Sequence, residues 1–306
     1  MPAQRRFGMD HGHYAWSPII TRGVLRWPEN ARVAVCVIVN LEHLEWNPPE
    51  GSYQPPSLAG GLAPRPFPDY ARFSHRDYGH RVGIFRVLDV LERHRIKPTV
   101  AMDALTAEHY PYLVQHCLGR GCEIIAHGIA ATRMLTSRMS EAEERAYIRQ
   151  SVEALRRATG TAPVGWLSPE YGESARTPQL LAEAGIHYVC DWPNDEQPYP
   201  MQTPQGSLFA LPILLELDDI NALWDRRVTI DRYAELLHES FETLYRDGAD
   251  TGRLLVLNLH PWLIGQPFRI RYLNEALGRI MRRQGVWGAT GSEIIDWYRS
   301  HPPTAR

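Results

Sequence analysis

The run VAVCVIV at residues 33–39 is followed at once by Asn40, Glu42 and His43. A continuous apolar run of this length is typical of a strand that is buried on both faces, as in a parallel sheet. Polar residues at the carboxyl ends of such strands are where α/β proteins place their active sites. The run therefore predicts a parallel sheet, and its polar ending predicts the ligand-binding edge of that sheet.

Two further apolar runs end in the same way. The run CEIIA at residues 122–126 precedes His127, and the run LLVLNL at residues 254–259 precedes His260. Because the carboxyl ends of parallel strands lie at one edge of a sheet, we expect the three endings to form a single site.

Strand-like and helix-like segments alternate along most of the chain. The expected strands are 33–39, 97–102, 122–126, 164–167, 187–190, 208–214 and 254–259. The expected helices are 80–94, 106–119, 140–159, 177–185, 230–246 and 270–284, with a last one from about Ser292. This alternation predicts an α/β fold in which parallel βαβ units close into a barrel-like sheet.

Length and composition favour a single domain. The chain has 306 residues, and no change in composition marks a boundary within it. We expect one catalytic domain over residues 1–306, with a core at about 31–298 and an N-terminal extension at 1–30. The formal net charge of −2 offers no attraction to nucleic acid or to an anionic membrane, so neither is an expected partner.

Cysteine usage and targeting signals predict a cytoplasmic protein. No apolar run approaches the roughly 18 residues of a membrane span, and residues 1–17 lack the apolar segment of a signal peptide. The four cysteines match no CxxC metal or redox motif, and they are Cys36, Cys117, Cys122 and Cys190. We expect Cys36 and Cys122 to behave as small apolar core residues.

Residues 47–68 contain seven prolines and follow the first strand directly. A loop this long inside a compact domain is usually functional or disordered, and its position puts it on the face of the expected site. The alternative is a surface excursion or a subunit contact, and we expect the protein to be a homo-oligomer.

Asn40 and Glu42 lie two residues apart, so on a strand they point to the same side, whereas His43 points to the other. Glu42 could hold a metal, orient a substrate or act as a base; the alternative is a solvated strand end. His127 and His260 are candidate proton donors, because the histidine side chain ordinarily titrates near neutral pH and commonly protonates leaving groups. Each could instead be a structural histidine.

Two segments after strands supply further candidate contacts. Arg269 follows a turn after His260 and could hold a carboxylate or a carbonyl, although it could equally cap the turn. Residues 191–199, DWPNDEQPY, combine acids, amides and aromatics, which suits a small polar ligand with an apolar face. The alternative is that this segment is a simple polar turn.

Together these segments resemble the polysaccharide deacetylase (NodB-homology) superfamily over about residues 31–298. The motifs occur in family order, and they are Asn40-Leu41-Glu42, RDYGHRVG at 76–83, His127-Gly128, GWLSPE at 165–170, and His260-Pro261 with Gly265, Pro267 and Arg269. The segment 191–199 resembles the allantoinase-like branch in particular.

The resemblance implies a distorted (β/α) barrel that hydrolyses a non-peptide amide. It also implies an aspartate base, a divalent metal on an aspartate and two histidines, and His260 as general acid. This chain departs from that pattern at two positions, because Asn40 stands at the base position and Ala131 stands where the second metal histidine is expected. Only Glu42 and His127 remain as metal ligands, so no cofactor is certain and a divalent metal such as zinc stays an alternative.

We therefore expect a hydrolase of carbon–nitrogen bonds that acts on a small polar linear or cyclic amide or ureide. The resemblance assigns catalysis to Glu42, His127 and His260. The expected substrate contacts are Asn40, Arg81, Glu170, Asp195 and Arg269. The alternatives are an N-deacetylase of an N-acetylated sugar or glycan, and a catalytically altered barrel that binds a small molecule or carbohydrate.

Overall fold

The structure, a computed structural model, describes residues 9–50, 52 and 69–304. Most of the proline-rich segment that we expected near the site, 51 and 53–68, lies outside the described residues. No helix among the described residues is long and apolar enough to cross a membrane.

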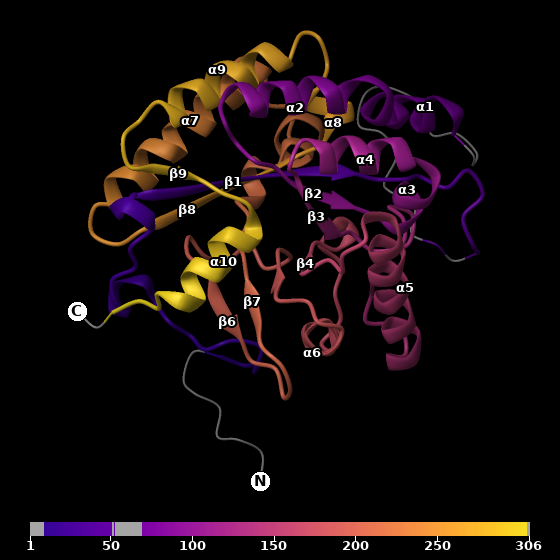
Figure 1. Cartoon of the computed structure of the whole chain (residues 1–306), viewed down its shortest axis with the longest axis horizontal. Coiled ribbons are helices and arrows are strands. Elements are labelled where there is room, and N and C mark those ends of the chain that lie inside the picture. The colour runs from indigo at the N-terminus through magenta and orange to yellow at the C-terminus, as the bar shows by residue number, and fades with distance from the viewer. Residues whose placement is uncertain (1–8, 51, 53–68, 305–306) are drawn as a thin grey trace.

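The described strands form one curled sheet (Figure 1). The strands are β1 (Val33–Leu41), β2 (Thr99–Met102), β3 (Glu123–Ala126), β4 (Gly165–Trp166), β5 (Tyr188–Val189), β6 (Tyr199–Met201), β7 (Leu208–Ala210), β8 (Arg253–Leu259) and β9 (Val286–Gly288). Their order is β6-β7-β5-β4-β3-β2-β1-β8, and β9 pairs with the beginning of β1. Every pair is parallel except β6 with β7. The prediction of parallel βαβ units that form a distorted barrel is confirmed.

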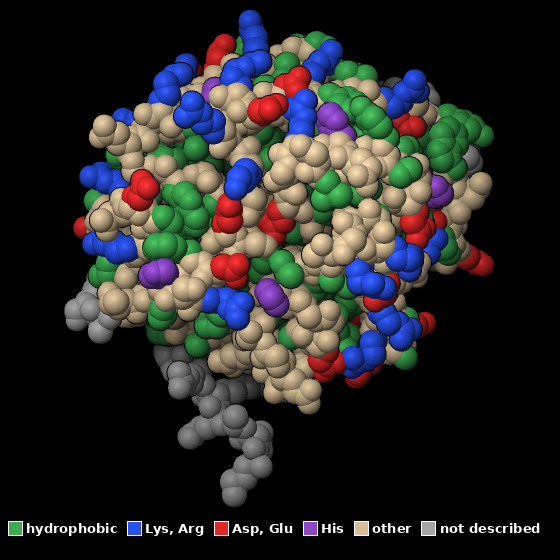
Figure 2. Space-filling view, in the orientation of Figure 1, with side chains coloured by type: hydrophobic (Ala, Val, Ile, Leu, Met, Phe, Trp, Pro, Cys, Tyr) green, Lys and Arg blue, Asp and Glu red, His purple; other side chains and the backbone are tan. Residues whose placement is uncertain are grey.

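Helices connect the strands, and most of them cover the outside of the sheet, whereas Ile294 and Ile295 of the last helix join the inner core. They are α1 (Tyr70–Tyr78), α2 (Ile84–Arg93), α3 (Ala104–His109), α4 (Pro111–Gly119), α5 (Glu141–Thr159), α6 (Thr177–Glu183), α7 (Ile230–Asp247), α8 (Pro261–Ile264), α9 (Ile270–Met281) and α10 (Gly291–Ser300). Figure 1 shows α2, α7 and α9 side by side above β1 and β8. The surface in the same view carries charges of both signs, interspersed without a large patch of either (Figure 2).

Several predicted elements have different boundaries in the structure. The helix expected at 106–119 is two helices, α3 and α4, because Pro111 has no N–H to continue the first one. The helix expected at 80–94 begins with a π-helical turn, η3 (Gly79–Gly83), and α1 before it was not predicted. The strands β6 and β9, of three residues each, were also not predicted.

Helix α5 begins and ends where the sequence predicts. Ser140 and Glu143 form a reciprocal capping box at its start. Gly160 ends it in the left-handed conformation, with φ of 81°.

Alternating residues of β1 enter two different cores. Val33, Val35, Val37 and Val39 pack against the outer helices. Ala34, Cys36 and Ile38 fill the inside of the barrel, and Leu254 and Val256 of β8 and Ile125 of β3 join them there. Because strand side chains alternate, the inward-facing series of each strand continues to the polar residues that follow it. The fold thus directs Asn40, Glu42, His127, Asn258 and His260 toward one mouth of the barrel.

Two glycines allow η3 to lie against the segment after His260. A Cβ at Gly83 would lie 2.0 Å from the carbonyl oxygen of Pro261, and one at Gly79 would lie 3.0 Å from the backbone nitrogen of Trp262. Only glycine permits this approach of the two backbones. The RDYGHRVG segment therefore supports the loop that carries His260.

Candidate active site

A cavity opens at the carboxyl ends of the barrel strands. It encloses about 420 Å³ including its mouth. Its polar lining includes Asn40, Glu42, His127, Ser168, Glu170, Tyr171, Asp218, Asn221, Asp225, Asn258 and His260. The three strand endings that the sequence singled out therefore meet in one place.

Glu42 lies between the two histidines. Its Oε1 is 3.3 Å from Nε2 of His127, and its Oε2 is 3.8 Å from Nε2 of His260. Burial alone would raise the pKa of Glu42, but His127, His260 and Arg76 outweigh it and lower that pKa to about 2. Glu42 is therefore ionised at neutral pH.

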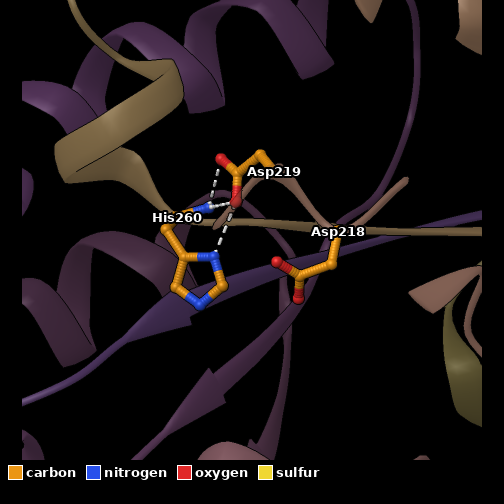
Figure 3. Close-up of side chains that lie close together, drawn as sticks. All are labelled: Asp218, Asp219 and His260. Atoms are coloured by element: carbon orange, nitrogen blue, oxygen red, sulfur yellow. Dashed lines mark hydrogen bonds and ion pairs between the residues drawn. The ribbon is translucent and has the colours of Figure 1, made fainter. Parts of the chain in front are cut away.

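His260 is held by a buried carboxylate. Its Nδ1 donates a hydrogen bond of 2.7 Å to Oδ1 of Asp219, and its backbone N–H donates to both oxygens of the same carboxylate (Figure 3). Burial alone would lower the pKa of His260, but Asp219, Asp218 and Glu42 raise it to about 9. The imidazolium therefore persists at neutral pH with Nε2–H facing the cavity.

His127 is fixed by a backbone carbonyl. Its Nδ1 donates to the carbonyl oxygen of Leu167 at 2.6 Å, which leaves Nε2 directed at Glu42. Burial opposes the charged form, but the hydrogen bond with Glu42 and its charge raise the pKa of His127. Gly128 follows in the left-handed region, with φ of 68°, and a Cβ there would lie 2.2 Å from the hydroxyl of Tyr147.

Arg76 is a cation that the sequence did not assign to the site. Its guanidinium lies 3.9 Å from Oε2 of Glu42 and 3.9 Å from the ring centroid of Trp262. The stacking and the neighbouring carboxylate compensate for the burial of this charge.

Glu170 reaches the cavity from a strained turn. Glu170 and Tyr171 both have left-handed backbones, with φ of 53° and 55°. Glu170 is exposed at the mouth of the cavity, where partial desolvation and the charge of Glu42 raise its pKa. The loop that follows is anchored by the fully buried Glu144, whose carboxylate accepts hydrogen bonds from Ser174 and Thr177.

Asn40 belongs to a chain of hydrogen bonds across the cavity floor. Its Nδ2 donates to Oδ1 of Asn258 at 2.7 Å and to the carbonyl oxygen of Leu259 at 3.1 Å. Nδ2 of Asn258 in turn donates to the Tyr171 hydroxyl at 2.8 Å and to Oδ2 of Asp218 at 2.7 Å. Asn40 is thus rigidly oriented.

Three of the expected substrate contacts do not line this cavity. Arg81 is exposed on the π-helical turn, and Asp195 forms an ion pair with Arg22 beside a different cavity that is lined by Tyr14 and Tyr298. Arg269 donates to the carbonyl oxygen of Leu263 at 3.2 Å and lies over the ring of Phe268. These placements correct the sequence-based expectation, whereas Asn40 and Glu170 do line the cavity.

Sequence reasoning also missed residues that the structure brings to the site. Asp218 and Asp219 precede a π-helical turn, η6 (Ile220–Asp225), and follow no strand, so the strand-ending pattern could not find them. Asn258 was hidden inside an apolar run, although its position two residues before His260 places it on the same face. Arg76 lies in the RDYGHRVG motif at 76–83, in which the expected substrate contact was Arg81.

Comparison with known proteins identifies the family. Residues 76–189 match the polysaccharide deacetylase family. A Schizosaccharomyces pombe protein that carries the name polysaccharide deacetylase is 27% identical over 303 residues, which cover 90% of this chain and 93% of that protein. The chain is similar to polysaccharide deacetylases over most of its length. It is accordingly a polysaccharide deacetylase-like hydrolase.

Further relatives of this polysaccharide deacetylase-like chain carry the names of different activities. The peptidoglycan deacetylase of Helicobacter pylori is 27% identical over 258 residues, which cover 74% of this chain and 87% of that enzyme. The crystal structure of Puue allantoinase superposes with a TM-score of 0.80 at 25% identity and covers 91% of this chain and 94% of that one. A probable polysaccharide deacetylase structure from Pseudomonas aeruginosa has a TM-score of 0.81 at 24% identity and covers the same shares of the two chains. These structures share the distorted barrel.

Members of the superfamily commonly use a divalent metal, and two places could be considered for one here. At the family position, Ala131 packs with Leu44 and Phe73 and offers no ligand, and the cation beside Glu42 is Arg76. A dication placed on Glu42 would be repelled by that guanidinium. The family position therefore does not fit a metal.

The second place is formed by Asp218, Asp219 and His260, whose candidate ligand atoms all lie within 4.8 Å of one another. Every carboxylate oxygen in this cluster already accepts a hydrogen bond. The His260 nitrogen that faces Asp219 is itself a donor. The cluster therefore fits a hydrogen-bonded acid pair and does not fit a resident metal.

We expect dialysis against a strong chelator to leave both activity and melting temperature unchanged. Because a metal that binds only the folded state raises the melting temperature, added Zn²⁺ at several times the protein concentration should also produce no shift. Differential scanning calorimetry with and without Zn²⁺ tests this directly. Loss of activity on chelation that Zn²⁺ restores, or a Zn²⁺-dependent stabilisation abolished by Asp218→Asn, would contradict it.

Proposed function

We propose that the chain hydrolyses the amide bond of a small polar linear or cyclic amide or ureide, without a metal. The observation that carries this proposal is the His260 imidazolium, which Asp219 orients so that Nε2–H faces Glu42 in a small cavity. A positioned imidazolium is suited to protonate the nitrogen that leaves when an amide bond breaks. The likeness to Puue allantoinase supports a ureide as substrate.

Two of the carboxylates that line the cavity, Glu42 and Glu170, have pKa values that are shifted in opposite directions, which suits them to different roles. Glu42, with its pKa lowered, remains ionised and orients the attacking water and the two histidines. Glu170, with its pKa raised, is the better proton acceptor of the two and takes the proton of that water. His127 donates Nε2–H to the carbonyl oxygen as negative charge develops on it.

The proposed reaction adds water across the carbon–nitrogen bond. The water oxygen bonds to the carbonyl carbon while its proton passes to Glu170, and the carbon–nitrogen bond then breaks. The departing nitrogen takes the proton from Nε2 of His260, so that an acid and an amine leave the cavity. A second water returns the protonation states of Glu170 and His260 to those of the resting enzyme.

The test is a panel of purified amides with detection of the amine or ammonia released. Allantoin, hydantoins and linear ureides represent the proposed substrates. Chitin and peptidoglycan oligosaccharides represent the second candidate, N-deacetylation of a sugar, which the relatives from S. pombe and H. pylori favour. Turnover of oligosaccharides alone would replace the first proposal with the second. No turnover of any amide would favour a binding protein.

The charge state of His260 predicts a specific pH dependence. Because its pKa is raised to about 9, His260 is protonated below that pH and deprotonated above it, so kcat/KM should fall above about pH 9. Asp219→Asn removes the nearest charge that favours the imidazolium, and the alkaline limb should move to lower pH. The measurement is a pH profile of kcat/KM for both proteins. An alkaline limb that stays in place in Asp219→Asn would contradict this assignment.

A further inference from the structure

The orientation of the Asn40 amide is fixed by its partners. The Asp218 carboxylate can only accept, so Asn258 must turn its Nδ2 toward it and its Oδ1 toward Asn40. The carbonyl oxygen of Leu259 is also an acceptor, and it takes the other hydrogen of the Asn40 amide. Both donors of Nδ2 are therefore used on the β8 side, and Oδ1 of Asn40 must point away from β8.

That oxygen is a buried acceptor without a partner among the described residues. Asn40 is only 3% exposed, and it lines the cavity beside Glu42. An acceptor that is removed from water and left unsatisfied costs free energy, so such an atom in a binding cavity indicates a donor that arrives with a ligand. The nearby cavity groups Glu42 and Asp218 are acceptors and cannot supply it.

We propose that Asn40 determines substrate specificity by accepting a hydrogen bond from an N–H of the substrate. This inference names the substrate class of the proposed hydrolase, and it rests on the proposed function for the reaction itself. It restricts the substrate to amides and ureides that keep a hydrogen on nitrogen, and it disfavours esters and N,N-dialkyl amides. An uncharged amide suits this role because, unlike a carboxylic acid that binds a proton, it remains an acceptor at every working pH.

Substrates without an N–H should bind more weakly, because the hydrogen bond to Oδ1 of Asn40 is lost and nothing replaces it. An ester oxygen in place of the N–H would face Oδ1 of Asn40, so that two acceptors meet in a buried position. Sites that hydrogen-bond a substrate group reject analogues that lack it more strongly than apolar pockets reject a missing methylene. Asn258, Asp218 and Tyr171 act as positioning residues, because they hold the Asn40 amide in the orientation that selects for a donor.

The first test uses matched ligands and the unaltered protein. N-methylacetamide and methyl acetate differ only in N–H against oxygen, and N,N-dimethylacetamide replaces the hydrogen with a methyl group. We expect N-methylacetamide to bind about tenfold more tightly than either analogue in titrations followed by NMR, as one buried hydrogen bond predicts. It should also shift the side-chain amide signal of Asn40. Equal affinities for the three ligands would overturn the inference.

The second test removes the acceptor. Asn40→Ala should abolish the preference for N-methylacetamide, whereas Asn194→Ala, a matched change at an exposed asparagine outside the cavity, should keep it. A preference that survives in folded Asn40→Ala would overturn the inference. If Asn40→Ala does not fold, the ligand comparison with the unaltered protein still decides.

The two proposals fail in different ways. If no amide is hydrolysed but the N–H preference is present, the proposed hydrolysis fails and the role of Asn40 stands. If amides are hydrolysed, we expect Asn40→Ala to lower kcat/KM for 4-nitroacetanilide about tenfold more than for 4-nitrophenyl acetate, because only the anilide loses a hydrogen bond. An equal loss for both substrates would overturn the role of Asn40 and leave the hydrolase intact.

Discussion

Replacing His260 by alanine should lower kcat by about 10²–10⁴-fold, the usual contribution of a general acid. The amine cannot depart without a proton, and His127, whose Nε2 lies 3.3 Å from Oε1 of Glu42, is assigned to the carbonyl oxygen of the substrate. Steady-state kinetics on whichever amide the panel identifies give the value. KM should change little, because the imidazolium is needed mainly as the carbon–nitrogen bond breaks.

A matched control separates this role from a structural one. His187 is exposed and lies outside the cavity, so His187→Ala should retain full activity. Added imidazole should restore part of the activity of His260→Ala, since a small donor can enter the space left by the side chain. Unchanged kcat in a folded His260→Ala protein would rule out His260 as the proton donor and point to His127.

The sequence predicted those parts of the site that follow buried strands. Three long apolar runs ended on Glu42, His127 and His260, and strand alternation then directed these side chains into the barrel. The same logic applied to the chain before His260 finds Asn258 on the same face. A single asparagine within an apolar run resembles a chance polar substitution in a buried strand, so Asn258 was not predicted as a site residue.

The other residues of the site are placed by contacts between segments that lie far apart in the chain. Asp219 lies 41 residues before His260 and is brought to it by a π-helical turn that no local pattern announces. Arg76, in α1, stacks on the Trp262 ring, whereas Arg81, in the π-helical turn at 79–83, is exposed. Neither the exposure of Arg81 nor the pairing of Asp219 with His260 can be read from helical periodicity, because π-helical turns break it.

Glu42→Gln should reduce both stability and activity, because the charge of Glu42 faces two cations, Arg76 and the His260 imidazolium, and contacts His127. Arg76 is largely buried, and removing its carboxylate partner leaves an uncompensated charge at a cost of about 3–5 kcal/mol. Without Glu42 the pKa values of His127 and His260 should fall and the attacking water should lose its orientation. Urea unfolding and steady-state kinetics measure the two effects, and the exposed Glu153→Gln serves as the control.

The pH dependence of the stability difference between the unaltered protein and Glu42→Gln shows whether the missing charge causes that difference. Because the pKa of Glu42 is lowered to about 2, its stabilising effect is complete above the ordinary carboxyl pKa and disappears as the pH falls toward 2. The stability difference between the unaltered protein and Glu42→Gln should therefore shrink between about pH 5 and pH 2. Adding Arg76→Met removes the unpaired cation, so the double variant should recover part of the stability and none of the activity. Recovery of activity in that double variant, or a stability difference that is constant with pH, would mean that Glu42 acts through packing and that the site does not depend on its charge.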